Sequence, residues 1–130
     1  KLDKEMKLEK NLRINDLRIS DDWINANQET WHEIKLNTKK RKLFSPDQEN
    51  LLKQLSARKG HDTYEKLRKI DKPVLLTGGK YDGIAPVANM KSLQSQIKGS
   101  ELRLYEGGHL FLVQDKQAFK DICTWLSSLN

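Results

Sequence analysis

Two short strand-like runs joined by one helical pattern constrain what this chain can fold into. Residues 73–78 read Pro-Val-Leu-Leu-Thr-Gly, a continuous apolar run typical of a strand buried on both faces, and residues 101–105 predict a second strand. Between them Pro86 starts a helical pattern with one apolar face, which Gly99 ends. A strand, a helix and a strand with short connections form a crossover. The two strands are therefore predicted to be adjacent and parallel.

Such a pair of strands is not a complete fold, because parallel sheets need both faces covered and usually contain several strands. The missing neighbours are expected either in sequence that precedes Lys1 or in another copy of the chain. We accordingly expect the 130 residues to be a fragment of a longer protein, with the N-terminal strands of its sheet outside the chain.

A change of composition near Gly60 divides the chain into two parts. Residues 1–60 contain 19 apolar or aromatic residues and one glycine, Gly60 itself, whereas residues 61–130 contain 28 and the other six glycines. The first part predicts helices with narrow apolar stripes, typical of segments that cover something larger. We expect residues 1–60 to be a helical cap or lid segment and residues 61–130 to belong to an α/β core.

Within the first part, residues 12–19 predict either a small hairpin around Asn15-Asp16 or the irregular start of a helix. Ser20 is expected to cap a helix that continues to about Arg41. The segment Ser45 to Gln48 is a capping box and predicts a helix over residues 46–59. In the second part, Asp62 is expected to cap a short helix over 63–69, and a last helix is expected from about Lys116.

The charge pattern excludes several classes of protein. The net charge is +6, and the densest basic run, Lys39 to Lys42, points all round a helix and predicts a solvated helix end. No zinc spacing, phosphate-binding loop or aromatic-interleaved basic stretch is present, so we expect no nucleic-acid partner, no metal and no cofactor. No run is apolar enough for a membrane span or a signal peptide, and we expect a cytoplasmic protein without membrane contact.

The remaining histidines and the single cysteine receive structural interpretations. His32 is expected at the surface, and His61 near the start of the helix after Asp62. Cys123 excludes an internal disulfide and is expected to be a small core residue on the apolar face of the last helix.

Two side chains that carry chemistry follow the two predicted strands. Asp82 comes after the first strand and Gly79-Lys80-Tyr81, and His109 comes after the second strand and Gly107-Gly108. The carboxyl ends of neighbouring parallel strands meet at one edge of a sheet. There an aspartate can accept a hydrogen bond from one imidazole nitrogen and leave the other free to act as a base.

This pattern resembles the C-terminal part of the α/β-hydrolase family. The segments KPVLLTGGKYDGIAP and ELRLYEGGHLFLVQD are similar to the family's strands that carry the acid and the histidine, and the resemblance covers about residues 57–129. It implies an α/β fold in which a βαβα portion follows a helical cap, and it implies Asp82 and His109 as triad members. The substrate would be a small-molecule acyl compound such as an ester, thioester or lactone. Cap residues expected to line its pocket are Trp23, Trp31 and Phe44.

The family's nucleophile motif, Gly-x-Ser-x-Gly, is missing: no serine here has glycines at both flanking offsets. The nucleophile is therefore expected outside this chain, and the chain alone is expected to be inactive. The alternative is a non-catalytic interaction module with a hydrolase-like half-fold. Such a module would complete its sheet by self-association or with a partner, as a homo-oligomer formed through exposed sheet edges.

Overall fold

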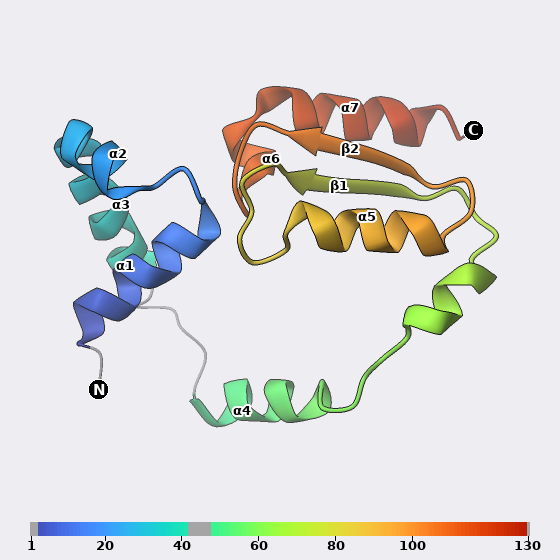
Figure 1. Cartoon of the computed structure of the whole chain (residues 1–130), viewed down its shortest axis with the longest axis horizontal. Helices are drawn as coiled ribbons and strands as arrows, with labels where there is room; N and C mark the ends of the chain where they lie inside the picture. Colours follow the sequence, from blue (N-terminus) through green and yellow to red (C-terminus); the bar gives the residue numbers. More distant parts are fainter. Residues whose placement is uncertain (1–2, 42–47, 130) are drawn as a thin grey trace.

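The computed structural model describes residues 3–41 and 48–129 and shows an α/β chain with many helices and one small sheet (Figure 1). The elements in chain order are α1 (Lys4–Asn15), α2 (Asp21–Ala26), α3 (Gln28–Arg41), α4 (Gln48–Ala57), the 3-10 helix η2 (Tyr64–Lys69), β1 (Leu75–Gly79), α5 (Val87–Gln96), β2 (Glu101–Tyr105), α6 (Phe111–Gln114) and α7 (Lys116–Ser127).

The sheet confirms the predicted crossover. β1 and β2 pair in parallel, from Leu75 opposite Glu101 to Gly79 opposite Tyr105, so the two strands end at the same level. Successive side chains of a strand point to opposite faces. Helix α5 covers the face to which Leu104 points, where its Met90 lies against Gly78, and α7 covers the other face (Figure 1).

The α7 face of the sheet carries a small aromatic core. Tyr105, Phe111 and Ala118 are buried together, and the two rings stack with centroids 5.8 Å apart. The Tyr105 hydroxyl also lies 3.2 Å from an oxygen of Asp121 on α7. We expected a loop after Gly107, whereas the structure has the short helix α6 there. The Phe111 ring stacks on Tyr105, and the Asp115 amide donates to the Phe111 carbonyl, which completes one helical turn.

The N-terminal helices differ from expectation in two places. Residues 12–15 are neither hairpin nor helix start but the last turn of α1, and an irregular segment over 16–20 follows it. Ser20 caps α2 as predicted, since its side chain accepts a hydrogen bond from the Trp23 amide at 3.1 Å. The expected single helix to Arg41 is broken at Asn27, whose side-chain amide donates to the Trp23 carbonyl and so ends α2.

Helices α1 and α3 pack against each other. Leu8 and Trp31 are buried, and the Lys35 ammonium pairs with both Glu5 and Glu9 of α1. Lys39, the first residue of the basic run, also pairs with Glu5, at 2.6 Å. Part of the run expected to be solvated therefore joins two helices, although exposed ion pairs of this kind contribute little, about 0–1 kcal/mol each.

Helix α4 and η2 lead from the N-terminal helices to β1. Residues 45–47 of the predicted capping box lie outside the described residues, and α4 begins at Gln48. Asp62 was expected to cap the next helix, but the N-cap residue of η2 is Thr63, whose side chain makes no capping hydrogen bond. The Asp62 carboxylate does accept the Tyr64 amide at 2.9 Å, from one position before the cap. The apolar stripe of α4 is exposed, with Leu52 66% accessible, so within the described residues it covers nothing.

The apolar face of α7 is also only partly covered. Ala118 is fully buried, but Phe119 is 64% and Leu126 54% exposed. Cys123, which we expected in the core, is an exposed free thiol, because the two-stranded sheet is too narrow to reach it. In the described ranges, 3–41 and 48–129, no helix has the length and apolar character needed to cross a bilayer.

The unpaired outer edges of β1 and β2 in the described sheet lead to a prediction about self-association. In the described residues β1 and β2 pair only with each other, so the outer edge of each strand offers backbone groups to another strand. We expect the isolated chain to sediment as a dimer or larger species at concentrations of about 100 µM, in the range where exposed strand edges associate.

Two further results decide this expectation. A Phe119→Glu variant keeps the strand edges but charges the exposed face of α7, and it should still associate if the edges hold the copies together. A monomeric wild-type chain in sedimentation equilibrium would contradict the prediction.

Candidate active site

The loop after β1 places Asp82 at the carboxyl edge of the sheet. Its Oδ1 accepts the backbone amides of Ile84 at 2.8 Å and Ala85 at 2.9 Å, so the carboxylate is held by its own loop. The residue is 5% exposed. Burial alone would raise the pKa of Asp82, but the hydrogen bonds from Ala85, His109 and Ile84 outweigh it and lower the pKa below its ordinary value. Asp82 is therefore an ionised, oriented acceptor at neutral pH.

The loop after β2 brings His109 to that acceptor. The Nδ1 of His109 lies 2.9 Å from Oδ2 of Asp82, and the imidazole is 44% exposed whereas the aspartate side chain is 4% exposed. An ionised carboxylate only accepts hydrogen bonds, so Nδ1 carries a proton, and in the neutral imidazole Nε2 then keeps a lone pair. Among the described residues Nε2 has no hydrogen-bond partner. The pair can therefore act as an oriented general base directed toward solvent.

Residues 14–17, at the end of α1, join the two loops. The Asn15 carbonyl accepts the His109 amide at 2.6 Å, and the Ile14 carbonyl accepts the Gly83 amide at 3.0 Å. The Leu17 amide donates to the Tyr81 carbonyl at 2.9 Å. We call residues 80–86, which follow β1, the acid loop, and residues 106–110, which follow β2, the histidine loop. Both loops are thus hydrogen-bonded to one segment that lies more than sixty residues earlier in the chain.

Gly108 permits this contact. A Cβ added to Gly108 would lie 2.1 Å from the Asn15 carbonyl oxygen and 2.7 Å from the Asp16 Cα, far closer than real Cβ atoms approach backbone. Only a glycine lets the histidine loop come this near to the end of α1.

The residues expected to line a substrate pocket are not brought together as a group. Trp23 is half-buried and borders a pocket of about 350 Å³ with Asp16, Gln114 and three others: Arg18, Ile19 and Ile34. Trp31 is a buried residue of α3, and Lys35 of the same helix lies over its ring. Phe44 lies outside the described residues.

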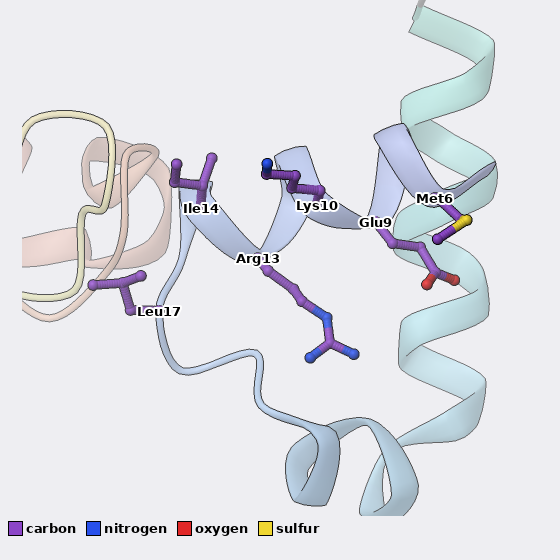
Figure 2. A pocket seen from close by; sticks show the side chains of 6 residues that line it. All are labelled: Met6, Glu9, Lys10, Arg13, Ile14 and Leu17. Atoms are coloured by element: carbon purple, nitrogen blue, oxygen red, sulfur yellow. The ribbon is translucent and has the colours of Figure 1, made fainter. Parts of the chain in front are cut away.

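A larger groove runs along α1 instead. It measures about 530 Å³ and is lined by five side chains of α1 and by Leu17, which lies just beyond the helix. The five residues of α1 are Met6, Glu9, Lys10, Arg13 and Ile14 (Figure 2). Its Leu17 end lies against the acid loop, since a Cβ on Gly83 would lie 2.9 Å from Leu17 Cδ2. Sequence reasoning did not select these residues, because α1 was not recognised as one helix.

The site contains polar residues that sequence reasoning also missed. Asp16 is 7% exposed, and its carboxylate accepts hydrogen bonds from Arg18 and from the Gln114 side chain. Burial would raise the pKa of Asp16, but the hydrogen bonds from Arg18 and Gln114 lower it overall. Asn15-Asp16 was noticed only as a turn-forming pair, and nothing local to it indicates contact with residue 114.

The other candidate ligands are dispersed. His32 and His61 are exposed, in agreement with their structural interpretation. In the part of the chain that the structure describes, no three His, Cys, Asp or Glu side chains lie close enough together to hold a metal ion.

Comparison with known proteins gives one partial similarity. Over 69 residues the chain is 35% identical to a poly(3-hydroxyalkanoate) depolymerase from Ectopseudomonas oleovorans, a hydrolase. The match covers 53% of this chain and 24% of that protein, so the chain spans about a quarter of the length of the curated relative that it matches. No family model matches the chain, and no solved structure matches it.

The close approach at Gly108 makes a prediction about stability. Gly108→Ala should lower the free energy of unfolding by at least about 3 kcal/mol, because backbone must move to admit the methyl group. Gly99→Ala is the matched control: its φ of +76° is unfavourable for alanine, but nothing lies near its Cβ, so about 1–2 kcal/mol is expected. Urea denaturation of both variants measures the difference, and equal losses would contradict the close contact.

The lowered pKa of Asp82 makes a prediction about pH. Its ionised form is favoured by folding, so its contribution to stability is fully present above the unfolded pKa of about 3.9 and is lost as pH falls through the lower folded value. The gap in stability between wild type and Asp82→Asn should therefore shrink between about pH 5 and pH 2.

Asp71→Asn is the control for this pH effect, because the Asp71 side chain is 81% exposed. Urea midpoints measured across the range test the expectation. A gap that stays constant with pH would show that the Asp82 charge is not stabilised in the folded chain.

Proposed function

We propose that this chain is the acid- and histidine-bearing part of a serine-type α/β-fold hydrolase. Its substrate class is a small acyl compound, an ester, thioester or lactone. Residues 61–130 would form the C-terminal portion of the core, and residues 1–60 its helical cap. Asp82 and His109 are the proposed catalytic residues, and the nucleophile lies on residues outside these 130.

The observation that carries this proposal is the 2.9 Å contact between Asp82 Oδ2 and His109 Nδ1 at the carboxyl ends of two adjacent parallel strands. The acid precedes the histidine along the chain, as in the order nucleophile, acid, histidine typical of the fold. The similarity to a depolymerase supports the same class of reaction, since it covers about half of this chain.

In the proposed reaction His109 moves the proton and Asp82 orients the ring. Nε2 would take the proton of the nucleophile hydroxyl as it attacks the acyl carbon, and Asp82 would stabilise the imidazolium that forms. Nε2 would then return the proton to the leaving oxygen or sulfur. A second turn of the same cycle, with water as the nucleophile, would release the acid.

Two observations support a nucleophile outside the chain. None of its serines has glycines at both flanking offsets. In addition, the described sheet has only two strands, and apolar side chains of α4 and α7 are exposed. Further strands and helices, which would also supply oxyanion-hole donors, would cover these surfaces.

A second candidate is a non-catalytic interaction module. The same unpaired strand edges favour it, because a half-sheet can bind a strand of a partner or of another copy. The two candidates differ in whether a nucleophile joins the Asp82–His109 pair.

Ester hydrolysis by the full-length protein that contains this chain tests the proposal. With p-nitrophenyl butyrate, His109→Ala should lower kcat by about 10³-fold or more and Asp82→Asn by a similar order, because each removes part of one catalytic unit. The isolated 130 residues should show no turnover. His61→Ala is the matched control, an exposed histidine outside the site, and should leave kcat unchanged.

Two results would count against a hydrolase. Turnover that survives His109→Ala would remove the role given to that residue. A full-length protein with no additional strands and no esterase activity would favour the interaction module.

A further inference from the structure

Asp16 and Gln114 form a bridge between the end of α1 and the histidine loop. One amide hydrogen of Gln114 Nε2 is donated to Asp16 Oδ2 at 2.9 Å, and Gln114 Oε1 accepts the Gly108 amide at 2.8 Å. The two side chains come from residues 98 positions apart in sequence. Their bridge ends on the residue directly before His109.

Asp16 is a fixed anchor for this bridge. It is buried, and its Oδ1 accepts both the backbone amide and the Nε of Arg18, at 3.1 and 2.9 Å. Its Oδ2 accepts Arg18 Nη2 at 2.6 Å beside Gln114. The Arg18 guanidinium also lies 5.0 Å from the centroid of the Tyr81 ring, next to Asp82 in the acid loop. A carboxylate with this many donors cannot move without leaving one of them unpaired.

His109 has few other restraints. Among the described residues its imidazole makes one hydrogen bond, to Asp82, and its side chain is nearly half exposed. Its backbone amide is bound to the Asn15 carbonyl. The position of the ring relative to Asp82 therefore depends on where the Gly107–His109 backbone is held.

We propose that Asp16 and Gln114 are positioning residues: they hold the histidine loop against the end of α1, so that His109 Nδ1 stays within hydrogen-bond distance of Asp82. The proposal rests on the proposed function only for its effect on turnover. Neither residue reaches the reacting atoms. A displacement of about 1 Å at a catalytic group can reduce a rate by about 100-fold, so a bridge of this kind is sufficient to control activity.

The tautomer of His109 tests the bridge without any substrate. Imidazole ¹⁵N spectra of the 130-residue chain should show the Nδ1–H tautomer as the major form of His109, because Asp82 accepts that proton. In Gln114→Ala the Nδ1–H form should become the minority. Gln117→Ala is the matched control, since Gln117 bonds to Asp121 on α7 and does not touch the loop; its spectrum should match wild type.

A double variant separates positioning from folding. Gln114→Glu places a carboxylate beside Asp16 and should disturb the loop, whereas Asp16→Asn with Gln114→Glu exchanges amide and carboxylate across the same contact. In the double variant the glutamate can accept both the Gly108 amide and the Asn side-chain amide, whereas Arg18 Nη2 loses its acceptor. The double variant is therefore compared with Asp16→Asn alone, which loses the same Arg18 bond. Recovery of the Nδ1–H tautomer in the double variant is the expected result. An unchanged tautomer in Gln114→Ala, or a loss that the exchange does not repair, would overturn the proposal.

Turnover by the full-length protein is the second readout. Gln114→Ala should lower kcat by about 10–100-fold with KM within about twofold, as expected when a catalytic group is misplaced but substrate contacts remain. Gln114→Glu should also lower kcat, and the double variant should recover most of the loss seen in Gln114→Glu. If the tautomer responds as predicted and His109→Ala does not affect turnover, the proposed hydrolase function fails while the positioning role stands. If kcat stays at the wild-type level in a variant whose tautomer has changed, the positioning role in catalysis is wrong.

Discussion

β1 and β2 pair in parallel with Gly79 opposite Tyr105, so both strands stop at the same level and their following loops start side by side. This register decides where Asp82 and His109 lie. A shift of one residue would move one loop by about 3.3 Å along the strand and turn its side chains to the other face of the sheet. The 2.9 Å contact between the two side chains then could not form. The glycines after each strand matter for the same reason, because they let the loops and the end of α1 come together within backbone contact.

Much of the α/β part could be predicted from the sequence because its signals are local. Proline and glycine mark the ends of α5, the apolar run marks β1, and the short connections require a parallel pair. The proximity of Asp82 and His109 followed from that topology, without information on side-chain conformation. The Ser20 cap was predictable for a similar reason, since its side chain bonds to a backbone amide three residues along the chain.

The missed features depend on contacts between distant residues. Residues 12–19 have weak local preferences, and the segment after α1 takes its conformation from bonds to Tyr81, Gly83 and His109. Asp16 became part of the site through Gln114, which no local pattern connects to it. Cys123 occupies a helical position that usually faces a core, but a sheet of two strands leaves that position in solvent.

Figure 1 shows that α4 and η2 form an arch between the N-terminal helices and β1, while the end of α1 contacts the loops at the opposite end of the sheet. The hydrogen bond between the Asn15 carbonyl and the His109 amide therefore closes a chain loop of more than ninety residues. Closing a loop of this length costs on the order of 4 kcal/mol of chain entropy. Cleavage of one peptide bond in α4 would leave Asn15 and His109 chemically unchanged. Their hydrogen bond would then require two separate polypeptides to associate. The geometry around His109 would then depend on the concentration of those polypeptides.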